Sequence, residues 1–308
     1  MENQTFFTQF YLTSFPVYPE TLPYFFLIFF ILYLVGVLAN FVIIKVTVQE
    51  NNLHTPMYFF LCNLSTVDIC YITVTLPKLM DILLTRKHSI TFIQCFTQLF
   101  FFLFLASTEI TLLSSMAFDR YVAICRPLHY QTTMSKRNCI IILAGTWLSG
   151  FGNSTCVTLY VSGLTFCHSN AIEQFYCEIK ALAKIACTDR GLGVLIFVDT
   201  FLFGLCPFLL SLISYGKIIS IILKIRSNEG RRKAFSTCTS HLTILLIFYG
   251  TIICMYMGPS SDLVNKQDYI FSVLFAAVTP MLNPLIYSLR NTEVRTAIVT
   301  NMKIKIFG

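Results

Sequence analysis

Three acidic residues lie inside long apolar stretches of the sequence, where ionisable groups are energetically costly and often functional. Asp68 and Glu109 fall near the middles of two such stretches, so both are expected at one depth, where no Lys or Arg occurs. Two carboxyls without a basic partner either share a proton or hold a cation such as sodium, with help from Ser114 or Asn283. The alternative is that each carboxyl is simply hydrogen-bonded to Ser or Thr. Asp199, the third acid, is placed to pair with an amine.

Four of the 12 cysteines are expected on the oxidising side of a membrane. They are Cys95, Cys167, Cys177 and Cys187, for which sequence alone allows three pairings. A bond from Cys95 to the loop that holds the other three would place a lid on the molecule. The other eight are expected as small buried hydrophobic side chains, and no cysteines have zinc-ligand spacing.

The elements that must position these groups are membrane-spanning helices. The chain has 308 residues, of which 56% are hydrophobic and only 12% charged. Its apolar stretches reach the length of about 20 residues that spans a bilayer, and they fall near 24–48, 57–81, 93–125, 139–161, 191–225, 234–258 and 269–289. This pattern predicts an all-α membrane protein with a bundle of seven transmembrane helices, and it argues against a soluble enzyme or a nucleic-acid-binding protein.

The distribution of positive charge predicts the orientation of the bundle. With the amino end outside, 15 of the 22 Lys and Arg residues fall on the cytosolic side, as the positive-inside rule requires. The expected organisation is one domain over 1–308, with an extracellular tail over 1–23 and a cytosolic tail over 290–308 that includes a short helix. Asn3 is a glycosylation sequon in the exposed tail, whereas Asn63 and Asn153 fall within predicted helices and are expected to be chance matches.

One face of the third helix connects the outer half of the bundle to its cytosolic end. Its residues recur at spacings of three and four, which places them on one side of a helix: Phe102, Ala106, Glu109, Leu113, Met116 and Arg120. Arg120 lies about 27 Å below Phe102 at the helical rise per residue. The outer end of this face is therefore expected to touch a ligand while the inner end meets the cytosol, although bundle core is the simpler interpretation.

Eight segments, in order along the chain, resemble the vertebrate odorant receptors of the rhodopsin-like G-protein-coupled family. They are Gly36 to Asn40 (GVLAN), Pro56 to Leu61 (PMYFFL), Leu64 to Asp68 (LSTVD), Met116 to Cys125 (MAFDRYVAIC), Ser214-Tyr215, Lys233 to Leu242 (KAFSTCTSHL), Phe248 to Gly250 (FYG) and Pro280 to Asn291 (PMLNPLIYSLRN). Tyr249 stands where the general rhodopsin-like pattern has tryptophan, and the KAFSTCTSHL segment at the start of the sixth span contains no acid to pair with Arg120. Odorant receptors share both departures.

The resemblance implies a receptor, not an enzyme, that binds a small organic odorant and activates a stimulatory (olfactory) G protein to raise cyclic AMP. It implies a switch at Asp119, Arg120 and Tyr121, with Tyr215 as the active-state partner of Arg120, and a moving inner end of helix seven at Asn283, Pro284 and Tyr287. The implied disulfides are Cys95–Cys177 and Cys167–Cys187. The implied location is the plasma membrane of olfactory sensory neuron cilia, in contact with membrane lipid.

The ligand pocket is expected in the outer half of the bundle, with mostly apolar walls. We expect it to be formed by Phe102, Leu103, Ala106, Ser107, Asp199, Thr200, Phe203, Tyr249, Ile252, Ile253 and Tyr256. His54 and His241 are expected to be structural polar groups. The alternatives are a rhodopsin-like receptor for an internal ligand, a transporter, which would show repeat symmetry that this chain lacks, and a membrane enzyme, for which no nucleophile–base pair is visible.

Overall fold

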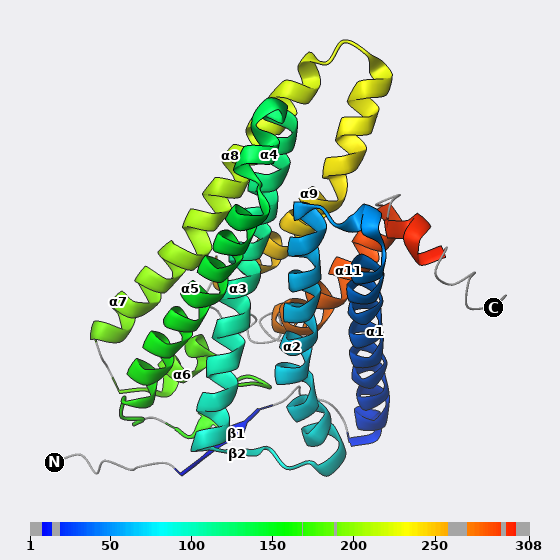
Figure 1. The fold of residues 1–308 in the computed structure, drawn as a ribbon. Helices are drawn as coiled ribbons and strands as arrows, with labels where there is room; N and C mark the ends of the chain where they lie inside the picture. Colours follow the sequence, from blue (N-terminus) through cyan, green and yellow to red (C-terminus); the bar gives the residue numbers. More distant parts are fainter. Residues whose placement is uncertain are drawn as a thin grey trace.

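The computed structural model describes residues 8–13, 19–167, 169–187, 190–257, 270–290 and 294–299. Within these ranges, five helices are long and apolar enough to cross a membrane, and two shorter apolar helices occupy Cys238–Cys254 and Ile270–Ile286. The helices of the bundle are α1 (Leu22–Gln49), α2 (Pro56–Thr85), α3 (Phe92–Cys125), α5 (Lys136–Ser162), α7 (Arg190–Asp199), α8 (Cys206–Lys224), α9 (Asn228–Met257) and α11 (Thr279–Arg290). The predicted seven-helix bundle is confirmed, because α7 and α8 form one continuous span (Figure 1).

Two spans contain a π-helical turn. Thr200–Leu205 joins α7 to α8, and Leu274–Val278 precedes α11 in the seventh span. The sixth helix begins at Asn228, six residues before the predicted 234, and extends with α8 beyond the other helices (Figure 1). Its first residues are polar, and hydropathy cannot detect a helix that continues outside the bilayer. The short α4 (Tyr130–Thr133) lies between α3 and α5.

The helix α3 is central to the packing, since it contacts α2, α5 and α8 as well as α9. Its predicted inner face is buried at Phe102, Glu109, Leu113 and Met116. Large apolar side chains such as Leu38, Phe197 and Leu148 are instead exposed on the outer helices, as expected of side chains that face lipid.

The GVLAN segment allows α1 to pack closely against its neighbours. A Cβ at Gly36 would lie 2.9 Å from Ile72 Cδ1 on α2, which is too close for a larger residue without a shift. Asn40 is buried and donates from Nδ2 to the carbonyl oxygen of Pro280, 3.1 Å away in the seventh span. A small residue and a buried amide therefore fix α1 against α2 and α11.

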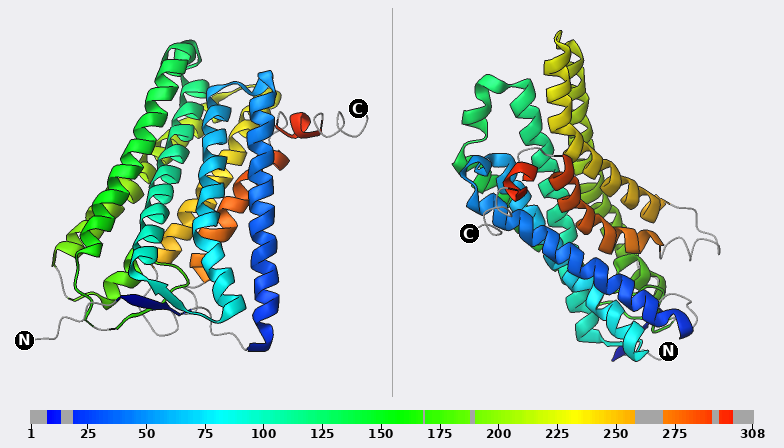
Figure 2. Two further views of the ribbon diagram at one scale, coloured as in Figure 1. Left: turned by 60° about the horizontal axis from the view of Figure 1, so that its bottom comes forward. Right: turned by 90° about the vertical axis from the view of Figure 1, so that its right-hand side faces the viewer.

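A small sheet covers the end of the bundle where α3 begins, which we call the sheet end. The strands β1 (Gln9–Leu12), β2 (Ser89–Thr91) and β3 (Ala171–Ile172) lie in the order β2-β1-β3, with β1 antiparallel to β2 and parallel to β3. Figures 1 and 2 show β1 and β2 side by side across this end. The sequence did not predict these strands, because two to four residues give no readable alternation and the partners are distant along the chain.

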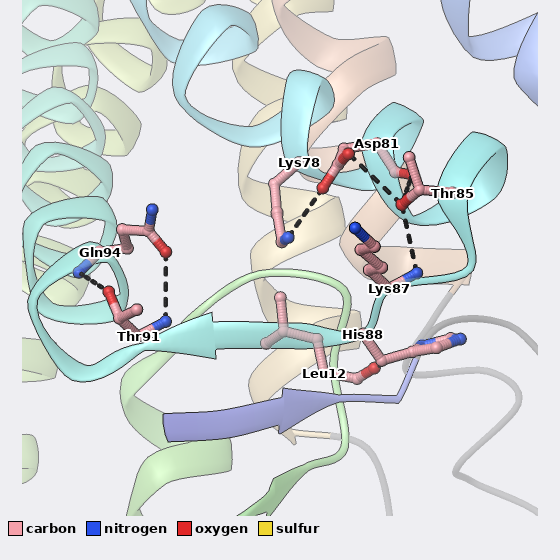
Figure 3. A network of polar contacts seen from close by, with 8 residues as sticks. All are labelled: Leu12, Lys78, Asp81, Thr85, Lys87, His88, Thr91 and Gln94. Atoms are coloured by element: carbon pink, nitrogen blue, oxygen red, sulfur yellow. Dashed lines mark hydrogen bonds and ion pairs between the residues drawn. The ribbon is translucent and has the colours of Figure 1, made fainter. Parts of the chain in front are cut away.

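Polar contacts fix the turn between α2 and β2 (Figure 3). Thr85 Oγ1 donates to the carbonyl oxygen of Asp81, and the Asp81 carboxylate forms a 2.9 Å ion pair with Lys78. The His88 ring Nδ1 lies 2.9 Å from the carbonyl oxygen of Leu12, so the loop holds β1 directly. Thr91 then begins α3 as the amino-terminal residue of a capping box with Gln94.

Residues 294–299 form the predicted short helix after the last span, with Val294 and Ala297 buried. Asn3 lies outside the described residues, so its glycosylation stays a prediction. Asn63 and Asn153 both lie within helices, α2 and α5.

Candidate functional site

At the end opposite the sheet, which we call the Arg120 end, Asp119 accepts hydrogen bonds from two side chains. Arg120 Nη2 and Nε donate to Oδ2 of Asp119 at 2.7 and 3.0 Å. The Tyr130 hydroxyl on α4 donates to Oδ1 at 2.9 Å. Burial and the neighbouring Asp119 carboxylate raise the pKa of Tyr130, so its hydroxyl stays protonated as a donor. Asp119 is fully buried. Because Asp119 and Arg120 are adjacent in the sequence, their ion pair forms within one turn of α3.

Tyr215 on α8 lies beside α9. Its hydroxyl is 2.8 Å from Nδ1 of the buried His241, and it also lies 3.5 Å from the carbonyl oxygen of Cys238. The histidine thus acts as a polar link between the fifth and sixth spans. Tyr121 is partly exposed, with Lys217 Nζ 5.4 Å from the centre of its ring.

Asp68 and Glu109 meet at one depth, as their positions in the sequence indicated. Asn283 on α11 donates from Nδ2 to Asp68 Oδ1 and Oδ2 at 3.2 and 3.1 Å, and to Glu109 Oε1 at 3.3 Å. All three residues are at most 2% exposed. Asn283 therefore contacts both acids, whereas Ser114 does not, because its hydroxyl contacts Pro207 O and Ser211 Oγ of α8. Pro284 lies next to this cluster inside α11, and the side chain of Tyr287 lies outside the described residues.

The predicted disulfides Cys95–Cys177 and Cys167–Cys187 are both present and hold the long loop over the bundle. The loop segment 174–178 is buried and packs deeply between the helices. The Tyr176 ring centre lies 4.8 Å from that of Phe102, and Gln174 Nε2 donates to Ser272 Oγ at 2.6 Å. Gln98 accepts from the backbone N–H of Cys177 at 3.0 Å. The lid that a bond from Cys95 to this loop would form is therefore present, but its deep insertion between the helices could not be read from the sequence.

The outer half contains a polar cluster and an aromatic cluster from the predicted pocket. Asn153 Nδ2 donates to Ser107 Oγ at 3.0 Å and to Asp199 Oδ1 at 2.7 Å, which joins α3, α5 and α7. Tyr249 is buried, with its ring centre 4.8 Å from that of Phe208. Phe102, Leu103 and Ser107 are buried, and the remaining predicted residues with partly buried side chains are Ala106, Phe203 and Ile252.

Two predicted pocket residues have a different placement. The side chains of Thr200 and Ile253 are exposed, so the inner-face placement expected for them is wrong in this structure. Each follows an inward residue, Asp199 or Ile252, by one position, and one position turns a helix by about 100°. The side chain of Tyr256 lies outside the described residues. Asn153 was missed, although an amide within an apolar stretch near the depth of Asp199 was a usable signal.

The fold has a known counterpart. The chain is similar to the crystal structure of squid rhodopsin with a TM-score of 0.71 and 17% sequence identity, covering 96% of this chain and 91% of that one. The bundle therefore belongs to the class of seven-helix membrane proteins that share the rhodopsin fold.

Sequence comparisons define the family within that class. The family model described as "Olfactory receptor" matches residues 29–305. The human protein named Olfactory receptor 13C9 is 48% identical over 304 residues, which cover 96% of each chain. The mouse protein named Olfactory receptor 1E16 is 43% identical over 297 residues, covering 96% of this chain and 95% of the relative. The chain belongs to the olfactory receptor family.

Proposed function

We propose that this receptor binds a small organic odorant beneath the 174–178 loop segment and activates a stimulatory G protein that raises cyclic AMP. The observation that carries the proposal is one continuous, mostly buried row of side chains along α3. This row runs from Phe102 against the loop, through Glu109 in the acid pair, to Arg120 at the opposite end. A ligand that contacts the Phe102 end of α3 can affect the Arg120 end only if its affinity differs between two conformational states of the bundle. The function is that of a receptor rather than an enzyme.

We further propose that the sheet end is extracellular and the Arg120 end cytosolic, in the plasma membrane of olfactory sensory neuron cilia. The positive charge at the Arg120 end supports this orientation, as do two disulfides at the sheet end, since disulfides persist in oxidising compartments. Expression restricted to another tissue would favour a receptor for an internal ligand.

The binding site would be mostly apolar, with the Ser107–Asn153–Asp199 cluster as its polar side. Such a composition suits a small volatile ligand that makes few directed contacts. Ala106 is partly buried and lies on α3 between Phe102 and Glu109, so a larger side chain there would change the shape of the proposed site. The substitution Ala106→Val is therefore expected to change potency about tenfold or more and to reorder the ligands, since one methylene in a tight pocket has an effect of this size. Cyclic AMP responses to a panel of neutral, cationic, acidic and thiol odorants measure this.

The matched control is Ala144→Val, which makes the same change at an exposed position of α5. In the same panel, Asp199→Asn should weaken the response to amines and spare neutral odorants. Unchanged potency and ranking in Ala106→Val would place the ligand elsewhere.

Sodium at Asp68 and Glu109 is the second part of the proposal. Two buried carboxyls share one amide donor, and within the described residues no third His, Cys, Asp or Glu joins them. Sodium suits oxygen ligands and would offset the cost of two neighbouring charges. The carboxyl oxygen atoms of Asp68 and Glu109 are its proposed ligands.

Raising sodium at constant ionic strength is then expected to lower basal cyclic AMP, because a cation that binds the resting state stabilises it. The decrease should reach about twofold when sodium equals its dissociation constant for that state. The double substitution Asp68→Asn with Glu109→Gln should abolish the dependence in receptors shown to reach the cell surface. A sodium response that survives the double substitution would mean that the acids are protonated or only hydrogen-bonded.

A further inference from the structure

A groove at the Arg120 end shares no residue with the ligand pocket or the acid pair. Its volume is about 620 Å³, and it is bounded by the ends of α1, α2 and α5 and by the segment after α4. Phe59 and Ile140 form part of its wall, and both are exposed on the outer surface of the bundle. Because these two side chains are exposed, the groove opens on the surface that lipid chains cover. Its volume is within the range of sites that hold small organic molecules.

The rim of this groove is positively charged. Lys136 is the first residue of α5, is exposed and lines the groove, so its positive charge adds to that of the amino-terminal end of a 27-residue helix. His54 also lines the groove, and its Nε2 lies 3.2 Å from the carbonyl oxygen of Val48. No Asp or Glu is among the lining residues. The groove thus combines an apolar wall with a cationic rim.

We propose that this groove binds a phospholipid with an anionic headgroup, with an acyl chain against Phe59 and Ile140 and the net negative charge of the headgroup at Lys136. The choice of an anionic lipid rests on the proposed orientation, which places this end in the cytosolic leaflet, where such lipids are concentrated. A zwitterionic lipid would fill the apolar wall equally well but would gain less from the charge at the rim.

The back wall of the groove leads to the receptor's switch. Cys139 Sγ donates to the carbonyl oxygen of Met134 at 3.6 Å, and both side chains are buried and line the groove. The backbone N–H of Met134 donates to the carbonyl oxygen of Tyr130, whose hydroxyl donates to Asp119. A bound lipid would therefore hold α4 in the position that supports the Asp119–Arg120 pair and would favour the resting state.

The test is native mass spectrometry of the purified full chain in detergent, titrated with phosphatidylserine and with phosphatidylcholine of the same acyl chains. Wild type is expected to bind phosphatidylserine more tightly. Lys136→Gln should lower that affinity about fivefold, which is the effect of one Lys near an anionic surface, and should lower the affinity for phosphatidylcholine less, because that headgroup has no net charge. Ile140→Trp, which narrows the groove at an exposed position and keeps the charge, should weaken both lipids.

Lys224→Gln is the matched control, because Lys224 is an exposed lysine at the same end that does not line the groove. Equal binding of the two lipids by wild type, or equal loss in Lys136→Gln and Lys224→Gln, would overturn the proposal. Displacement of phosphatidylserine by cholesterol at equal concentration would assign the groove to a sterol. Binding in detergent does not depend on orientation or on signalling, so its outcome is separate from that of the proposed function.

Discussion

Arg120→Ala is expected to abolish the odorant-dependent rise in cyclic AMP while ligand binding and surface display stay close to wild type. The physical reason is the position of Arg120 at the end of the buried α3 face, where its guanidinium is held by two hydrogen bonds to Asp119. In the active state this cation is proposed to turn toward the G protein and Tyr215. The alanine side chain has no charge and no hydrogen-bond donor, so it can contact neither partner in this way. The measurement is cyclic AMP in cells, with surface receptor counted by antibody.

Arg137→Ala is the control for charge at the same end, since Arg137 is exposed on α5 and makes no proposed switch contact. It should signal normally. Asp119→Asn should act in the opposite direction and raise basal signalling, because it weakens the contacts that hold both Arg120 and Tyr130. Normal signalling by Arg120→Ala would refute the coupling role.

Cys177→Ser is expected to remove most receptor from the cell surface. The Cys95–Cys177 bond closes a loop with a sequence separation of 82 residues, and loss of a native disulfide of this kind costs about 2–5 kcal/mol. The same bond anchors the 174–178 segment between the helices, so its loss would also release Tyr176 from Phe102. Surface display and the thermal unfolding temperature of purified receptor measure the effect.

The double change Cys95→Ser with Cys177→Ser should be no worse than either single change, because each alone already removes the bond. Cys254→Ser is the control for a cysteine that is free and exposed on α9. Full surface display of Cys177→Ser would show that helix packing alone holds the loop.

The spans and the acid pair could be predicted because each depends on local properties of the sequence. Hydropathy reports the length of a buried stretch, and the position of Asp68 and Glu109 within their stretches gave their common depth. The disulfide pairing came from family resemblance, since cysteine positions alone allowed three pairings. The sheet and the buried 174–178 segment depend on contacts between distant parts of the chain, which have no local pattern.

The fifth span shows why helical periodicity misplaced a pocket residue. Its inward residues lie at a spacing of four through the π-helical turn: Asp199, Phe203, Pro207, Ser211 and Tyr215. In an α-helix, repeated steps of four drift around the axis, because a turn holds 3.6 residues. A π-turn holds more residues and corrects the drift. No sequence pattern predicts this π-helical turn. The residues of the fifth span that face the interior of the bundle could therefore not be assigned from spacing alone.

The pairing of β1 imposes an order on biosynthesis. Gln9–Leu12 is synthesised before any of the spans, yet Leu12 contacts His88, 76 residues later, and Thr13 bonds to Ile172, 159 residues later. The strand must therefore wait, with its backbone groups unpaired, until four spans and the loop after them have been synthesised. Until then it is an open strand edge that chaperones of the secretory pathway can bind. We therefore expect release of the receptor for export to depend on the late pairing of β1 with β2 and β3.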